Sequence, residues 1–149
     1  MTMKKLLRFI PALVIMAVIF ILSAQTGDES SLLSDSVVSA AAGEKNVGSE
    51  VLTVIVRKSA HFLEYAALGA AVYFGLRGVG EDKRQGKRLL LSAAFGGLYA
   101  GSDELHQYFV PGRACMAVDV LIDTCGAMFG AAFMFLVIKL FDRLGKNDK

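Results

Sequence analysis

Residues 127–138 read AMFGAAFMFLVI, an apolar run without a single charged side chain. A comparable run, FIPALVIMAVIFILSA, occupies residues 9–24. The chain of 149 residues is 54% hydrophobic and has a mean hydropathy of +0.51, which exceeds what a soluble domain normally carries. The sequence therefore predicts a protein that is largely surrounded by lipid.

Four segments are apolar enough to cross a membrane, for which a helix needs about 20 residues. They cover about residues 9–25, 60–76, 89–110 and 114–141. Because most connections between them are short, we predict an all-α polytopic membrane protein whose four transmembrane helices form one bundle in a single domain, residues 1–149. The first segment follows basic residues as a signal peptide would, but it lacks an Ala-x-Ala cleavage site, so an uncleaved helix is favoured.

The distribution of Lys and Arg predicts the orientation, because cytoplasmic flanks carry the excess of positive charge. Twelve of the 16 basic residues fall on one side: Lys4, Lys5, Arg8, Arg77, Lys83, Arg84, Lys87, Arg88, Lys139, Arg143, Lys146 and Lys149. The other four are Lys45, Arg57, Lys58 and Arg113. Both termini and the middle loop are therefore expected in the cytoplasm, and residues 26–57 and the turn at Pro111 outside.

The long outer loop, residues 26–57, has apolar side chains at helical spacing: Leu32, Leu33, Val37 and Val38. This spacing is typical of a short helix in the membrane interface, whereas the Ser- and Ala-rich composition also fits a solvated linker. Both interpretations stay open.

Small residues predict where the helices approach one another closely. They include Gly69, Gly96, Gly97, Gly101, Gly126 and Gly130. The two cysteines, Cys115 and Cys125, would lie roughly 15 Å apart along one helix, which is too far for a disulfide, so we interpret both as packing residues.

Ionisable and polar side chains collect where the predicted topology brings the end of the third span to the level of the starts of the second and fourth spans. The candidate site residues are Lys58, His61, Tyr65, Asp103, Glu104, Gln107, Arg113 and Asp119. Each charge in the membrane interior costs roughly 2.5 to 3.5 kcal/mol, so we expect them to form an inward-facing network. A solvated rim at the helix ends is the alternative.

These residues also form ordered motifs: Lys58-x-x-His61-Phe62-x-x-Tyr65-x-x-Leu68-Gly69, then Asp103-Glu104-x-His106-Gln107-x-Phe109-x-Pro111-Gly112-Arg113, then Asp119 with Gly126 and Gly130. The series, with Ser23-x-Gln25 at the end of the first span, closely resembles the VanZ-like membrane protein family. One departure is Asp123, which stands where the family pattern usually has Asn. The resemblance implies a bacterial cytoplasmic-membrane protein of a family named for low-level resistance to the lipoglycopeptide teicoplanin.

Three functions fit the candidate residues. The first is an enzyme that acts on a lipid or cell-wall precursor at the outer leaflet, with His61 or Glu104 as the general base and Asp103 or Asp119 orienting His61. Lys58 and Arg113 would bind phosphate or carboxylate. Tyr65 and Gln107 would be further substrate contacts. A binding protein would use the same cations without turnover. A proton-coupled transporter subunit would need a polar relay that the apolar lower halves of the spans do not offer.

Other ligands have less support in the sequence. The net charge of +2, without a basic stripe, argues against nucleic acid. No compact metal-ligand motif is present, so no metal is predicted, although His61 and His106 with nearby carboxylates could hold Zn or Mn. The sequence leaves the cofactor, the exact substrate and assembly into a homo-oligomer open.

Overall fold

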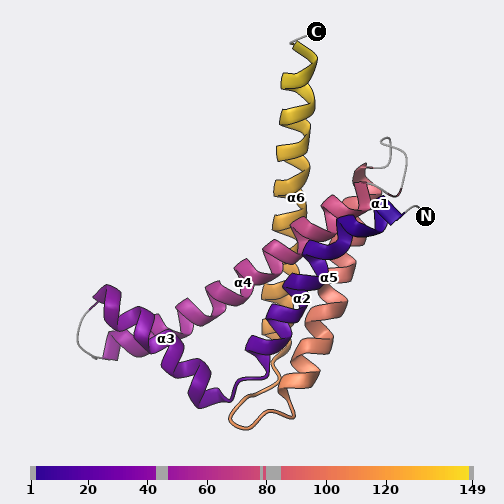
Figure 1. Ribbon diagram of the computed structural model, residues 1–149. Coiled ribbons are helices and arrows are strands. Elements are labelled where there is room, and N and C mark those ends of the chain that lie inside the picture. The colour runs from indigo at the N-terminus through magenta and orange to yellow at the C-terminus, as the bar shows by residue number, and fades with distance from the viewer. Residues whose placement is uncertain (1–2, 43–46, 78, 80–84, 148–149) are drawn as a thin grey trace.

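The computed structural model describes residues 3–42, 47–77, 79 and 85–147, and within them the chain is helical with no strand. The elements in chain order are α1 (Met3–Leu6), the 3-10 turn η1 (Leu7–Phe9), α2 (Ile10–Ser23), α3 (Gly27–Ala42), α4 (Val47–Arg77), α5 (Gln85–Gln107) and α6 (Ala117–Asn147) (Figure 1). The all-α prediction is confirmed.

Helices α4 and α6 form the central pair of the fold. Helix α5 packs against both, and α2 lies across α4 and α5. The Tyr99 hydroxyl of α5 donates a hydrogen bond to the Met16 carbonyl oxygen of α2 at 2.8 Å, which fixes α2 against the bundle. Helix α3 folds back on the first half of α4, and together they form an arm that extends away from the bundle (Figure 1).

The close approach of α4 and α6 depends on glycine. A Cβ atom on Gly126 would collide with the Phe62 carbonyl oxygen, one on Gly130 with the Ala66 carbonyl oxygen, and one on Gly69 with the Ala127 carbonyl oxygen. The predicted packing role of these three glycines is therefore confirmed. Gly101, in contrast, has open space around its Cβ position, so the same prediction was wrong for it.

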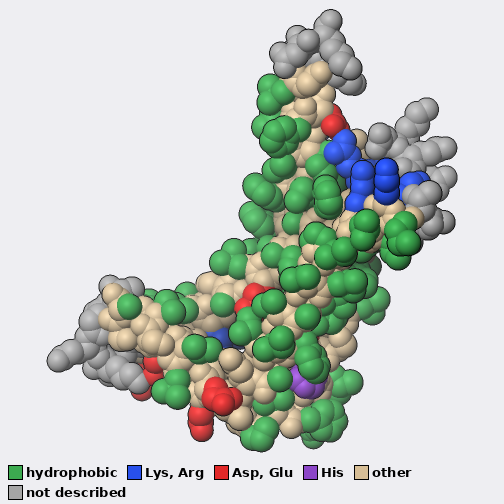
Figure 2. Space-filling view, viewed as in Figure 1, with side chains coloured by type: hydrophobic (Ala, Val, Ile, Leu, Met, Phe, Trp, Pro, Cys, Tyr) green, Lys and Arg blue, Asp and Glu red, His purple; other side chains and the backbone are tan. Residues whose placement is uncertain are grey.

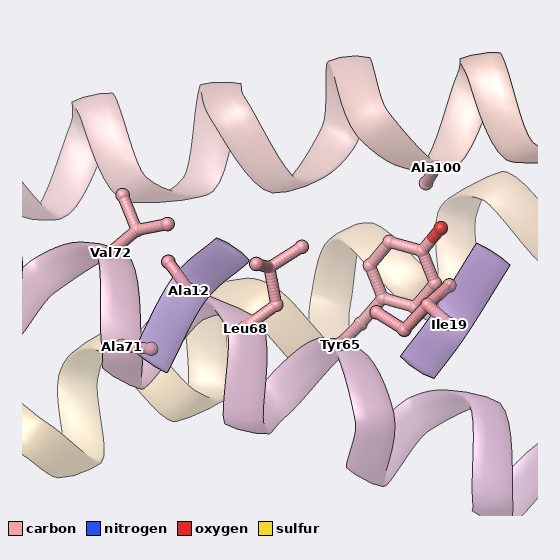
Figure 3. Packing of buried hydrophobic residues seen from close by; sticks show 7 residues of the cluster. All are labelled: Ala12, Ile19, Tyr65, Leu68, Ala71, Val72 and Ala100. Carbon is pink, nitrogen blue, oxygen red and sulfur yellow. The ribbon is translucent and has the colours of Figure 1, made fainter. Parts of the chain in front are cut away.

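A small apolar core fills the space between α2, α4 and α5. Figure 3 shows Tyr65, Leu68 and Val72 of α4 packed beside Ala12 and Ile19 of α2, close to α5. Tyr65 and Leu68 have no exposed surface. The core residues of α4 follow its polar residues Lys58 and His61 along the chain, so the core lies farther along this helix than the polar end.

The outside of the bundle is apolar. Two helical stretches, Met3–Ser23 and Ala117–Gly145, are long and apolar enough to cross a membrane, and only 17% and 28% of their most apolar windows are buried in the fold. Figure 2 shows hydrophobic side chains over most of the visible face. A soluble protein rarely exposes apolar surface on this scale, so lipid is the expected neighbour of α2 and α6.

Basic and acidic side chains are concentrated at opposite ends of the molecule. Most visible Lys and Arg side chains gather at the end that carries the N-terminus, whereas most Asp and Glu side chains lie toward the opposite end (Figure 2). The first end also holds the end of α4 and the start of α5, and α6 runs toward it with its C-terminal half (Figure 1). The described parts of the three basic segments therefore share one end of the molecule.

Residues 26–57, expected as a loop, are mostly helical. Thr26 and Glu29 form a capping box at the start of α3: the Thr26 N–H donates to Glu29 Oε2 at 2.9 Å, and the Glu29 N–H donates to Thr26 Oγ1 at 3.3 Å. This cap stabilises the start of a helix, so for α3 the helical interpretation is favoured over the solvated linker. Helix α4 then begins well before residue 60, whereas α5 ends at Gln107 and α6 begins at Ala117, because a turn around Pro111 separates them.

Candidate functional site

A polar cavity of about 130 Å³, the outer pocket, lies at the acidic end of the bundle between α4, α6 and the turn that joins α5 to α6. Its lining residues are Arg57, Lys58, His61, Gln107, Gly112, Arg113, Ala114, Met116, Asp119, Ile122 and Asp123. Five of the eight predicted site residues therefore meet in one cavity. The other three, Tyr65, Asp103 and Glu104, are buried outside its lining.

One wall of the outer pocket is an ion pair between Lys58 Nζ of α4 and Asp119 Oδ1 of α6. The side chains are 31% and 24% exposed, so the pair is partly shielded from water. It joins the two central helices where they begin to separate. Since the Lys58 charge is matched by Asp119, the pair contributes little net charge to the cavity.

Arg113 is held by neutral acceptors. Its Nε donates to the Gln25 carbonyl oxygen at 3.1 Å, its Nη2 to the Leu22 carbonyl oxygen at 3.3 Å, and its Nη1 to Gln107 Oε1 at 3.4 Å. In the part of the chain that the structure describes, Arg113 forms no ion pair. Its guanidinium has five N–H groups, so two remain for another acceptor.

The turn that carries Arg113 is fixed by local geometry. Gly112 has a φ of 74°, in the left-handed region that favours glycine. The Gly27 N–H donates to the Pro111 carbonyl oxygen at 3.1 Å, and a Cβ atom on Gly27 would collide with the Gly112 carbonyl oxygen. The end of α2 and the start of α3 therefore hold the turn against the bundle.

Burial lowers the pKa of the Arg113 guanidinium, and the positive charge of Arg57 lowers it further. An arginine side chain still stays protonated at neutral pH. The negative charges of Asp103, Glu104 and Glu64 raise this pKa and offset part of the effect.

Asp103 and Gln107 lie one turn apart on α5 and connect to this arginine. Gln107 Nε2 donates to Asp103 Oδ2 at 3.0 Å, while Gln107 Oε1 accepts from Arg113. Asp103 is 4% exposed and does not line the cavity. Asp103 therefore orients the Gln107 amide, so that the amide oxygen points to Arg113.

Glu104 supports the turn before α6. The Met116 backbone N–H donates to Glu104 Oε2 at 2.9 Å, and the Glu104 side chain is almost fully buried. This contact was not anticipated from the sequence, which suggested Glu104 as a general base. The geometry assigns one of its oxygens to the backbone.

His61 lies beside Asp123, a carboxylate that was not among the predicted site residues. His61 Nδ1 lies 3.8 Å from Asp123 Oδ2, a distance too long for a hydrogen bond. Asp123 has no exposed surface, and among the described residues neither of its oxygens nor His61 Nδ1 has a hydrogen-bond partner. That Asp103 or Asp119 orients His61 stays a prediction, and Asp123 is a further carboxylate beside this histidine.

The remaining candidates lie outside the outer pocket. Tyr65 belongs to the apolar core, where its hydroxyl is buried without a partner among the described residues. His106 stacks on Phe20 of α2 with ring centroids 4.7 Å apart. The described residues contain no group of three His, Cys, Asp or Glu side chains arranged to hold a metal ion. Cys115 and Cys125 are unpaired, and both are exposed rather than packed.

Sequence reasoning did not select two cavity residues, Arg57 and Asp123, as site residues. In the sequence, Arg57 is counted among the four basic residues expected on the outer side, and Asp123 is noted as a departure from the resembled pattern. Their positions one turn from selected residues, at four before His61 and four after Asp119, were the available signal, because such residues share a helix face.

Comparison with known proteins agrees with the motif pattern. A family model described as VanZ/LLP1 matches residues 9–139, which include every residue that lines the outer pocket. No curated protein and no solved structure matches the chain. With a match that extends from the first apolar helix into the last, the chain belongs to the VanZ/LLP1 family.

Proposed function

We propose that the protein crosses the bacterial cytoplasmic membrane four times, with both termini in the cytoplasm and the outer pocket at the extracytoplasmic face. The shared location of the three basic segments supports this orientation, because positive charge is concentrated on the cytoplasmic side of membrane proteins. Helices α4 and α5 would be the second and third spans. Their polar side chains, among them Lys58, His61 and Asp103, make them less apolar than α2 and α6.

In this orientation the outer pocket binds an anionic group of a membrane lipid, a lipid-linked cell-wall precursor or a lipoglycopeptide. The observation that carries the proposal is the setting of Arg113: neutral acceptors fix it, no carboxylate pairs with it in the described residues, and Arg57 adds a second positive charge to the cavity. A phosphate or carboxylate would satisfy the two free guanidinium N–H groups in a fork geometry. Since a cavity needs roughly 10 to 15 Å³ to hold one water molecule, the pocket has room for several waters or one small anionic group.

A catalytic function is the second candidate, and the His61–Asp123 pair favours it. A histidine beside an acid, with unused hydrogen-bonding atoms at the edge of a cavity, is suited to hold or move a proton. In that case Lys58 and Arg113 would bind the substrate and His61 would act as the general base. Transport has less support, because the buried side chains of α4 beyond the pocket, Leu68, Ala71 and Val72, are apolar and offer no polar relay.

The test is susceptibility to teicoplanin and vancomycin in bacteria that express matched membrane levels of wild type, Arg113→Ala, His61→Ala, Glu104→Gln and the control Lys87→Ala. Lys87→Ala removes one positive charge at the other end of the molecule. If the pocket binds without turnover, protection against the lipidated drug is lost in Arg113→Ala and kept in Glu104→Gln and Lys87→Ala. If it is an enzyme, His61→Ala abolishes protection although the protein still folds.

Equal protection by wild type and every variant would contradict a working role of the outer pocket in resistance. A direct measurement then separates binding from resistance: the purified protein is titrated with a phosphate-bearing lipid, and Arg113→Ala is compared with Arg113→Lys. Arg113→Lys keeps the charge and loses the fork, so it should bind more weakly than wild type and more tightly than Arg113→Ala.

A further inference from the structure

A second polar cavity lies at the opposite, basic end of the molecule, between α4, α5 and α6. This inner basic pocket has a volume of about 300 Å³ and is lined by Tyr73, Arg77, Gln85, Arg88, Phe135, Ile138, Lys139, Asp142 and Arg143. Four of these side chains are positively charged and one is negatively charged. None of them belongs to the outer pocket.

Among the described residues of the lining, one carries a carboxylate, Asp142, and this carboxylate already has a partner. Arg77 Nη2 donates to both oxygens of Asp142, at 2.8 and 2.9 Å, so these two charges largely cancel. Among the described residues, no acidic side chain pairs with Lys139 or Arg143. The pocket therefore carries a net positive charge that its own acid does not neutralise.

The pocket has cationic side chains on one side and an apolar wall on another. Tyr73 is 2% exposed and meets the Phe135 ring edge-on, with centroids 6.3 Å apart, so the inner wall is aromatic. Lys139 Nζ lies 5.5 Å from the centre of the Phe135 ring, which directs its ammonium group across this wall. A ligand with an anionic head and an apolar remainder matches both surfaces.

We propose that the inner basic pocket binds a phosphate ester. Basic pockets between membrane helices on the cytoplasmic side are suited to phosphate head groups, and arginine presents its donors in a fork that fits phosphate oxygens. The phosphate comes from one of two sources, an anionic phospholipid of the inner leaflet or a soluble phosphate ester. The aromatic wall favours the lipid. This site rests on the membrane orientation proposed above, but it does not depend on what the outer pocket binds.

The experiment uses the full chain purified in an uncharged detergent. Binding of short-chain phosphatidylglycerol is measured against phosphatidylcholine, and glycerol 3-phosphate is added as a soluble competitor. The test variant Lys139→Gln/Arg143→Gln is compared with Lys4→Gln/Lys5→Gln, which removes the same charge from exposed positions near the same end. At about fivefold per cation, the test variant should bind phosphatidylglycerol about 25-fold more weakly, and the control should match wild type.

A gain-of-affinity variant guards against loss of folding. Asp142→Asn releases Arg77 and removes the acid of the described lining, so it should tighten phosphatidylglycerol binding about fivefold, whereas Asp28→Asn on α3 should not change it. Competition by glycerol 3-phosphate at equal concentration would identify a soluble ester as the source, and lack of competition would identify the lipid. Equal weakening by both double variants, or equal affinity for phosphatidylglycerol and phosphatidylcholine, would overturn the proposal.

Discussion

Lys58 of α4 and Asp119 of α6 form an ion pair at the point where the two central helices diverge toward the outer pocket. Farther along both helices, Gly69, Gly126 and Gly130 bring the two backbones into contact. The pair therefore joins the helices at the polar end, where small residues no longer do so. Because both side chains are only partly exposed, the interaction is expected to be stronger than a surface salt bridge.

Removing one partner of this pair should destabilise the fold by about 1 to 2 kcal/mol, since it leaves a partly buried charge alone. Lys58→Met and Asp119→Asn should each lower the free energy of unfolding in mixed detergent micelles, and the double variant should lose less than the sum of the two. The matched pair Arg77 and Asp142, with Asp142 55% exposed, should show coupling of only about 0.5 kcal/mol. Additive losses at Lys58 and Asp119 would show that the pair does not couple the helices.

Adding one methyl group to Gly130 should disrupt the α4–α6 contact, because its Cβ would overlap the Ala66 carbonyl oxygen. We expect Gly130→Ala to cost about 1 to 3 kcal/mol of stability, measured by unfolding in detergent. Gly101→Ala is the control, because nothing lies near its Cβ position, and it should be neutral or slightly stabilising in a helix. Similar melting behaviour of the two variants would contradict the backbone contact.

The native cysteines offer a direct test of orientation. Cys115 lies in the turn beside the outer pocket and Cys125 lies on the apolar surface of α6, and both side chains are exposed. A membrane-impermeant maleimide applied to intact cells should label Cys115 and leave Cys125 unmodified, with Cys115→Ser and Cys125→Ser as matched controls. Labelling of Cys115 only after the cells are opened would reverse the proposed topology.

Glu104 should stabilise the turn before α6 as a hydrogen-bond acceptor, and its negative charge should not be needed for this. Glu104→Gln keeps an oxygen that accepts from the Met116 N–H and should stay close to wild type in stability, whereas Glu104→Leu leaves that backbone N–H unsatisfied at a cost of about 1 to 3 kcal/mol. Hydrogen exchange of the Met116 amide would measure this directly. Fast exchange in Glu104→Gln would mean that the carboxylate charge, and not the acceptor, holds the turn.

Acid should loosen the start of α3. Hydrogen bonds from the Thr26 backbone and hydroxyl lower the pKa of Glu29 from its ordinary value of 4.5. The stabilisation of the capping box is thus fully present above that value and is lost as the pH falls through the lowered pKa of the folded state. Exchange of the Thr26 amide should accelerate over that range in wild type and show no such step in Glu29→Gln.

Periodicity and composition sufficed for part of this structure. The apolar runs at residues 9–24 and 127–138 predicted helices because only a helix satisfies its own backbone in lipid. The spacing of Gly126 and Gly130 predicted a close contact, and spacing along α4 and α6 brought Lys58, His61 and Asp119 to one level. These are properties of single helices and of the order in which they follow one another.

The partners inside the site could not be predicted in the same way. Asp123 faces His61 because of how α6 is rotated against α4, and Arg113 reaches the carbonyl oxygens of Leu22 and Gln25 because the turn at Pro111 meets the end of α2. Both depend on helix crossing angles and on backbone acceptors, which every residue carries and no sequence motif marks. The length of α4 was missed for a related reason: its first half packs on α3 and is not itself apolar enough to look like a span.

Helix α4 is continuous from Val47 to Arg77, a length of about 46 Å at about 1.5 Å per residue. One unbroken rod therefore bears the α3 arm near its start, Lys58 and His61 in the middle, and Arg77 at its far end. Since α3 packs on the first half of α4, a displacement of the α3 arm would be transmitted along this helix to Lys58 and His61 in the outer pocket.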